Sequence, residues 1–201
     1  MKIPARLFVS LLFVSISFVS FSQSVLYKQT SEVNNLMVGY QADYGSLSRF
    51  YFTENSPERR DRLNKLRRDY LQQLEQLKYE TLPTGSKVDY ILFKKDLEDE
   101  LRTAEQEQKE YAAVASWFPF AEKIYAIEKS RRRGTQPDAQ KLAAQMNDLT
   151  DEIDKTTKSL DKEKGIEIAL IRRAQGIVRG LQAALKNVND FYMGYDPMFT
   201  W

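Results

Sequence analysis

The side chains in this sequence that could do chemistry are mainly carboxylates and guanidinium groups, because the chain contains no cysteine and no histidine. Their absence excludes disulfides, thiolate nucleophiles, imidazole metal ligands and histidine general bases. A zinc site of the usual kind is excluded with them, and only a site built from carboxylates remains. We therefore predict that this chain alone holds no catalytic residue, no cofactor and no metal.

The densest acidic run could form such a carboxylate site. It contains Asp96, Glu98, Asp99 and Glu100. Asp96 and Glu100 are four residues apart and would share one face of a helix, as carboxylates do in bundle metal sites. Those sites add an E-x-x-H pair, which this sequence lacks, so we interpret the run as a solvated helix face. The alternative, a carboxylate-only metal enzyme, predicts stoichiometric metal in the purified protein.

Two shorter patterns have a structural explanation beside a functional one. The three arginines at residues 131–133 could grip a phosphate or carboxylate, but at a helix end they complement the macrodipole and the last carbonyls. Gly176 and Gly180 predict close approach of a neighbouring backbone. A membrane-dimer motif is excluded there, because charged side chains interrupt the segment: Arg172, Arg173 and Arg179.

Two aromatic clusters could line a ligand pocket, since such pockets favour aromatic walls. The first, at residues 117–120 (WFPF), is interpreted as core at a helix junction. The second lies at residues 191–201, and we predict that it faces a cleft or an interface with a portion of the protein beyond residue 201. Its candidate residues are Tyr195, Asp196, Pro197, Phe199 and Trp201. In this hypothesis Asp196 and Pro197 fix a turn that presents the flanking aromatic rings.

Long amphipathic helices must position these groups. Ser56 and Pro57 mark a helix start, with Ser as the cap and Pro in the first turn. An apolar stripe follows for about twenty residues: Leu63, Leu66, Tyr70, Leu74 and Leu77. A second helix is predicted from Ser86 to about Ala115, with one apolar side: Val88, Ile91, Leu92, Leu101, Ala104 and Tyr111. Before Ser56 we expect only a short helix, interrupted by Gly39 and Gly45.

Three further helices are predicted after Pro119, which disfavours helical geometry at the residue before it. The first spans Ala121 to Arg133, with Ile124 and Ile127 inward, and stops at Gly134. The second has a nearly heptad seam: Leu142, Met146, Leu149, Ile153 and Leu160. After a turn at Gly165, the last runs to about Asn189 with this face: Ile166, Leu170, Ala174, Ile177, Leu181, Leu185 and Val188. The fold class is all-α, an antiparallel bundle that forms the N-terminal part of a larger helical protein.

The first 22 residues predict a secretory signal peptide. Lys2 and Arg6 precede an apolar run at residues 7–21, and Ser20 and Ser22 occupy the −3 and −1 positions for cleavage before Gln23. The alternative is an uncleaved anchor, but the run is shorter than the roughly twenty residues that a spanning helix needs. We therefore expect an exported protein, periplasmic or extracellular. Its regions are the signal at 1–22, a segment with a short helix at 23–55, and a helical region at 56–201.

The charge balance bears on partners. The sequence has 30 basic and 28 acidic residues, and without Lys2 and Arg6 the two signs are equal. Nucleic acids and anionic membranes attract proteins with a basic field, which a neutral chain lacks. We therefore expect neither partner for the mature chain.

Four segments resemble the DUF885 family of bacterial proteins. They are SPERR at residues 56–60, KVDYIL at 87–92, FPFA at 118–121 and GYDPMFTW at 194–201, in the family's order. The resemblance covers about residues 50–201, and its last segment is the most specific. It implies an exported, helical, zinc-dependent peptidase-like enzyme.

The departure from the family is as informative. Family members carry an H-E-G-x-P-G-H motif far downstream, in which two histidines hold zinc and the glutamate is the general base. No such motif occurs here, so no metal ligand carries over to any residue of this chain. The resemblance then implies a catalytically incomplete N-terminal region that helps to wall a peptide cleft, with zinc and a C-terminal catalytic portion in the full-length protein. The alternative is a self-standing periplasmic helical bundle that binds another protein through its apolar terminal patch.

Overall fold

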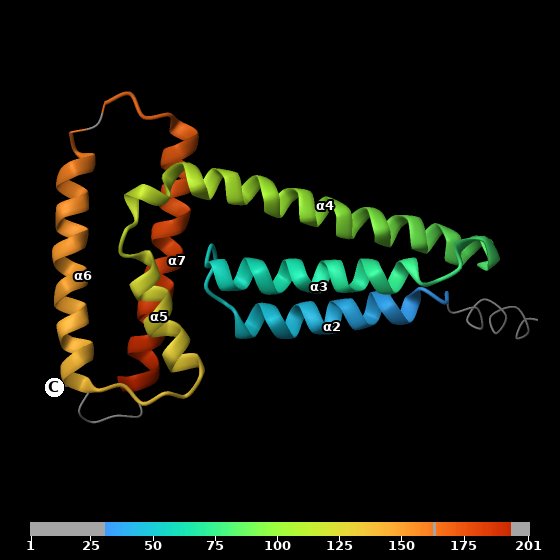
Figure 1. Ribbon diagram of the computed structural model, residues 1–201, viewed down its shortest axis with the longest axis horizontal. Coiled ribbons are helices and arrows are strands. Elements are labelled where there is room, and N and C mark those ends of the chain that lie inside the picture. The colour runs from blue at the N-terminus through green and yellow to red at the C-terminus, as the bar shows by residue number, and fades with distance from the viewer. Residues whose placement is uncertain (1–30, 163, 194–201) are drawn as a thin grey trace, which may run out of the picture.

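Helices account for most of the chain that the computed structural model describes, which is residues 31–162 and 164–193. Within these ranges there are six α-helices, α2 to α7, two 3₁₀ turns and no strand. The helices form two groups of three that cross at a steep angle (Figure 1). The prediction of an all-α fold is confirmed.

The first lobe consists of α2 (Asn34–Phe50), α3 (Pro57–Glu75) and α4 (Thr84–Val114), which lie side by side with alternating direction (Figure 1). A 3₁₀ turn at Tyr79–Thr81 connects α3 to α4. The helices enclose one apolar cluster of buried residues: Val33, Tyr40, Leu66, Tyr70, Leu74, Leu82, Phe93 and Leu97.

The start of α3 follows the sequence pattern closely. Ser56 is the cap, and its hydroxyl accepts a hydrogen bond of 3.3 Å from the backbone N–H of Arg59, while Pro57 takes the first helical position. Four of the five residues in the predicted stripe are buried: Leu63, Leu66, Tyr70 and Leu74.

Two expectations for this lobe are wrong. The helix α2 runs unbroken through Gly39 and Gly45, because its packing on α3 outweighs their weak helix propensity. A β-carbon at Gly39 would lie 2.9 Å from the Tyr70 hydroxyl, so the missing side chain makes room for that ring. On α4, three residues of the predicted apolar side are about half exposed, and the helix buries Phe93 and Leu97 instead, although Ala104 of that side is buried. The exposed residues are Val88, Ile91 and Leu92.

The second lobe consists of α5 (Ala121–Arg132), α6 (Ala139–Leu160) and α7 (Ile168–Met193). Gly134 and Gly165 both have positive φ and lie in the two connections, as the sequence predicts. The helix α7 begins two residues after Ile166 and ends four residues after Asn189. The core cluster of the second lobe is separate from that of the first lobe: Val114, Phe118, Phe120, Ala121, Ile124, Tyr125, Leu149, Ile177, Leu181 and Ala184.

The lobes are connected through the C-terminal end of α4, which continues into a 3₁₀ turn at Ala115–Trp117 before α5 begins. Phe118 and Phe120 at this joint are buried in the second core and Trp117 packs against it, so the interpretation of these aromatic residues as core is confirmed, while Pro119 is exposed. None of the helices in the described part of the chain is both long and apolar enough to cross a membrane.

Candidate functional site

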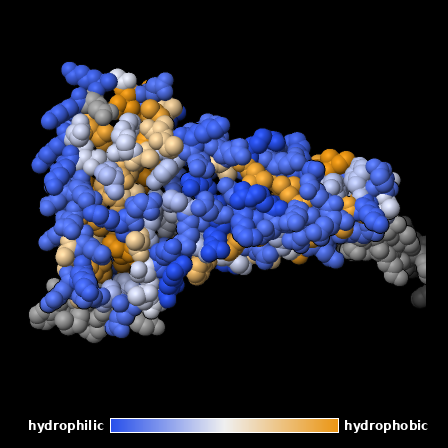
Figure 2. All heavy atoms as spheres, in the orientation of Figure 1, coloured by the Kyte–Doolittle hydropathy of each residue, from blue (hydrophilic) through white to orange (hydrophobic). Residues whose placement is uncertain are grey.

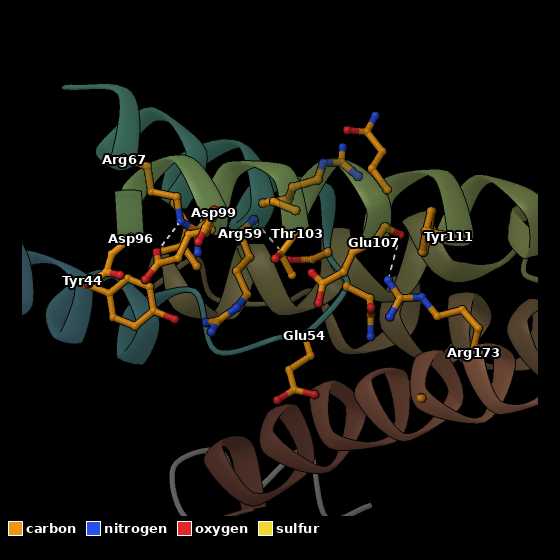
Figure 3. A pocket seen from close by; sticks show the side chains of 18 residues that line it. Tyr44, Glu54, Arg59, Arg67, Asp96, Asp99, Thr103, Glu107, Tyr111 and Arg173 are labelled. Carbon is orange, nitrogen blue, oxygen red and sulfur yellow. Dashed lines mark hydrogen bonds and ion pairs between the residues drawn. The ribbon is translucent and has the colours of Figure 1, made fainter. Parts of the chain in front are cut away.

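A polar cleft of about 700 Å³ lies between α3 and α4 and reaches α7 at one end (Figure 3). The two helices present polar residues at spacings of three and four, so that these side chains share the face toward the cleft. The α3 side contributes Arg59, Arg60 and Arg67, and the α4 side contributes Asp96, Asp99, Glu100, Thr103 and Glu107. The connection between α2 and α3 adds Glu54, and α7 adds Arg173 and Gly176.

A bridge between α3 and α4 forms one end of the cleft. Arg67 Nε donates to Glu100 Oε2 over 2.8 Å, and the Tyr40 hydroxyl from α2 donates to the same oxygen over 2.5 Å. Arg67 NH1 also donates to the Asn64 side chain over 2.7 Å. One carboxylate therefore ties together all three helices of the first lobe.

Burial and charge shift the pKa values of this bridge. Burial, and then the Glu100 carboxylate, raise the pKa of Tyr40 well above its ordinary value. Burial opposes the charge on Arg67, but the adjacent carboxylate outweighs it and raises the pKa of the guanidinium. Nearby, burial and a hydrogen bond of 2.8 Å to Asp43 raise the pKa of Tyr70 to about 12. These groups hold their protons at neutral pH, as a structural network does.

Two other arginines brace the cleft through backbone carbonyls. Arg59 NH1 donates to the carbonyl oxygens of Ser48 and Tyr51, over 3.0 and 2.5 Å, at the C-terminal end of α2. A cation at that position complements the helix macrodipole. On the α7 side, Arg173 NH2 donates to the Glu107 carbonyl over 2.8 Å, and its Nε lies 3.8 Å from a Glu110 carboxylate oxygen.

The remaining charges in the cleft include three carboxylates, those of Glu54, Asp96 and Glu107. Among the described residues these groups have no hydrogen bond or ion pair. The cleft therefore offers anchored cations and accessible anions side by side, an arrangement suited to holding a polar chain by charge and hydrogen bonds. It offers no thiol and no imidazole.

The residues present do not fit zinc. Within the described ranges no group of three acidic side chains is placed to hold a metal ion, and the sequence supplies no cysteine or histidine. The acidic run on α4 does not act as a set. Asp99 pairs with Lys95 and Arg102, Glu98 lies 4.0 Å from Lys94, and Glu100 forms the bridge to Arg67. The solvated-face interpretation thus holds for most of the run but not for Glu100.

A second charged group lies where the two lobes meet, and we call it the junction cluster: Glu58, Glu128, Arg131 and Arg132. Arg132 NH2 on α5 donates to Glu58 on α3 over 2.6 Å, and Arg131 NH2 donates to Glu128 over 3.0 Å. The arginine triplet was expected to serve mainly the end of its own helix. Arg131 and Arg132 instead belong to a network whose acids come from two different helices. The network is largely buried, since the side chains of Arg131 and Arg132 are only 14% and 7% exposed.

Of the other sequence-predicted residues, five lie outside the described residues and so have no observed position: Tyr195, Asp196, Pro197, Phe199 and Trp201. The two glycines of α7 differ in their surroundings. A β-carbon at Gly180 would lie 3.0 Å from the Glu54 carbonyl oxygen, which is the predicted close backbone approach, whereas one at Gly176 would meet nothing within 4 Å.

Sequence reasoning missed the cleft arginines and Glu58 as site residues. A signal was present, because Arg60 and Arg67 are seven residues apart and share one face of α3, but a polar face on a helix usually meets solvent. Only the tertiary structure shows that this face meets α4.

A comparison with known proteins identifies no relative of this chain. No family model, no curated protein and no solved structure matches the chain.

Proposed function

We propose that this chain is the N-terminal helical region of an exported, DUF885-like zinc peptidase, and that it forms a wall of the peptide-binding cleft. In this proposal the zinc ligands and the general base belong to a downstream portion. The polar cleft between α3 and α4 contributes recognition of the peptide chain and no bond-breaking group.

The observation that carries the proposal is the place of two resembling segments in the fold. SPERR supplies the Ser56 cap, the Glu58 carboxylate at the lobe junction and Arg59 in the cleft. FPFA supplies Phe118 and Phe120 at the joint before α5. A hollow of about 470 Å³ is lined by Ser56 to Glu58 on one side and by Glu122 and Tyr125 of α5 on the other. Residues that carry the resemblance thus occupy the positions that fix the lobes, as expected of a scaffold.

The test begins with the reading frame beyond the codon for Trp201. We expect it to continue to an H-E-G-x-P-G-H string, and the full-length product to bind one zinc ion and hydrolyse peptides in a chelator-sensitive manner. A stop codon directly after Trp201, or a full-length product without zinc, would refute the proposal.

Export is tested separately by mass spectrometry of the protein recovered from the periplasm or medium. We expect a mature chain that begins at Gln23. In the full-length enzyme, replacing Asp196 and Pro197 together by alanine should lower activity or stability, whereas unchanged behaviour would contradict the role assigned to that turn.

A self-standing protein-binding module is the second candidate, and one observation favours it. Val88, Ile91 and Leu92 on α4 are 51%, 52% and 54% exposed and lie on one turn of helix, as side chains that bind a partner can be. A photocrosslinker at Ile91 should then capture a defined partner in the periplasm, while one at the exposed Gln73 on α3 should not. Absence of any crosslinked partner at physiological salt would count against this candidate.

A further inference from the structure

The contact between α3 and α5, where the two lobes meet, is largely polar, whereas α4 and α7 also meet through apolar residues. The core clusters share no residue, and the side of the junction formed by α3 and α5 consists of charged and aromatic groups. Val114 and Tyr111 near the C-terminal end of α4 pack into the second core, so apolar burial fixes the joint. On the α3–α5 side, the angle between the lobes depends on a few specific contacts.

Glu58 makes most of those contacts. The Glu58 carboxylate, in the first turn of α3, lies 2.6 Å from Arg132 and 3.4 Å from Lys129 on α5. It also lies 3.8 Å from Arg133, which directly follows α5. Arg132 and Glu58 are 74 positions apart in the chain, so their pairing joins distant segments.

Arg132 is held from several sides at once. Its guanidinium lies 4.6 Å from the Tyr51 ring centre and 5.0 Å from the Phe50 ring centre, both at the end of α2. Its Nε lies 3.6 Å from a carboxylate oxygen of Glu128 on the same helix. A planar cation clamped in this way has one preferred orientation, which Glu58 must match.

The α7 side of the junction is joined by different contacts. The Glu54 carbonyl lies against Gly180, and Arg173 reaches the α4 backbone at Glu107. The polar cleft opens between these elements, with Arg59 and Asp96 on the first lobe and Arg173 and Gly176 on the second. A change in the angle between the lobes would therefore change the width of the cleft.

We propose that the Glu58–Arg132 pair is a latch that sets the angle between the two lobes and, through it, the opening of the polar cleft. The second lobe turns about the joint at residues 115–120, where α4 passes through its 3₁₀ turn to Phe118. With the latch closed, α5 is held on the first turn of α3 and the cleft has the width found in this structure. The proposal does not depend on the chain being part of a peptidase.

The test measures the distance between the lobes. The sequence has no cysteine, so Gln73→Cys on α3 and Ser159→Cys on α6, both exposed, place two spin labels without competition. Pulsed electron paramagnetic resonance then gives the distance distribution in the full chain. We compare the parent with Glu58→Gln, Arg132→Met and the double variant, each confirmed as folded by circular dichroism.

We expect one narrow distance for the parent and a shifted or broader distribution for each single variant. The double variant should move no further than either single one, because both remove the same contact. The matched control is Asp69→Asn, which removes an exposed acid from α3 whose partner Lys65 lies on the same helix, and it should keep the parent distribution.

Parent-like distributions in folded Glu58→Gln and Arg132→Met would overturn the proposal. A shift in Asp69→Asn as large as in Glu58→Gln would overturn it as well, because the effect would then follow from loss of any α3 acid. If one latch variant fails to fold, the other decides the question alone.

Discussion

The two lobes specify their helix packing by different means. In the α2–α4 lobe, the core includes Tyr40 and Tyr70, whose hydroxyls donate to Glu100 and Asp43 on neighbouring helices. In the α5–α7 lobe, the most deeply buried positions are mainly aliphatic, among them Ile177 and Ala184, which are fully buried. Directed hydrogen bonds fix the register of the first lobe, whereas side-chain shape has to do so in the second.

The surfaces of the two lobes differ as well. Figure 2 shows mostly hydrophilic atoms over the α2–α4 lobe and an apolar strip along the α5–α7 lobe, beside α6. There α5 and α7 pack closely, while α6 contacts its neighbours more sparsely. On this face the second lobe thus shows more apolar surface than the first, although Val88, Ile91 and Leu92 of the first lobe are exposed as well.

The largest effect on the difference between the lobes is expected from a cavity in either core. Leu97→Ala in the first lobe and Ile177→Ala in the second should each reduce the free energy of unfolding by about 2–5 kcal/mol, because both side chains are fully buried. Since the two cores are separate, each change should raise amide hydrogen exchange mainly in its own lobe. Equal effects on both lobes, measured by mass spectrometry, would show that they unfold as one unit.

The next effect concerns two glycines on one helix. Gly180→Leu should destabilise the protein by about 1–3 kcal/mol, because the new side chain would be forced against the Glu54 carbonyl. Gly176→Leu is the matched control. Its side chain enters the open cleft, and the better helix propensity should stabilise α7 by about 0.5–1 kcal/mol. Thermal unfolding distinguishes the two signs, and equal signs would contradict the different packing of these sites.

A smaller, pH-dependent effect is expected at the junction. Burial tends to raise the pKa of Glu58, but Arg132 and then Lys129 outweigh it and hold the pKa below its ordinary value of 4.5. Because the folded pKa is the lower one, this carboxylate stabilises the fold fully above pH 4.5, and the contribution is lost as pH falls through the folded pKa. Glu58→Gln should therefore cost about 1–2 kcal/mol at pH 7.

The same variant should lose that difference in acid. Denaturant unfolding at pH 7 and at pH 3 gives the comparison with the parent chain. A difference that stays constant, or that grows as pH falls, would show that the charge of Glu58 is not the stabilising element.

The smallest effect is predicted for an exposed ion pair within one helix. Lys65 Nζ lies 2.6 Å from Asp69, and both side chains are largely exposed. Lys65→Gln should cost only about 0.3–0.5 kcal/mol, and the difference should fade at high salt. A cost as large as that of Glu58→Gln would mean that burial does not increase the contribution of an ion pair to stability in this protein.

Much of the fold could be predicted from the sequence. The Ser56–Pro57 start, the stripe from Leu63 to Leu74 and the stop at Gly134 each follow from local physical chemistry, and the structure has them all. The continuity of α2 could not be predicted, because the favourable packing of Gly39 beneath Tyr70 is a contact between two helices.

Less of the cleft could be predicted from the sequence. Arg67 and Glu100 are 33 positions apart, and nothing local distinguishes them from solvated charges on two helix faces. The same holds for Glu58 and Arg132, whose meeting depends on how one lobe lies across the other. The opposite error occurred on α4. The sequence pattern places Val88, Ile91 and Leu92 on an apolar side, but they are exposed, since apolar residues at helical spacing need not face the nearest core.

The length of α4 has a mechanical consequence. This single helix of 31 residues runs from the tip of the first lobe to the joint with the second, and at 1.5 Å per residue it is about 46 Å long. It therefore acts as a lever, and a rotation of about 10° at the joint would carry the far end through about 8 Å for a helix of that length. An adjustment too slight to disturb either core would thus become a large displacement at the turn between α3 and α4.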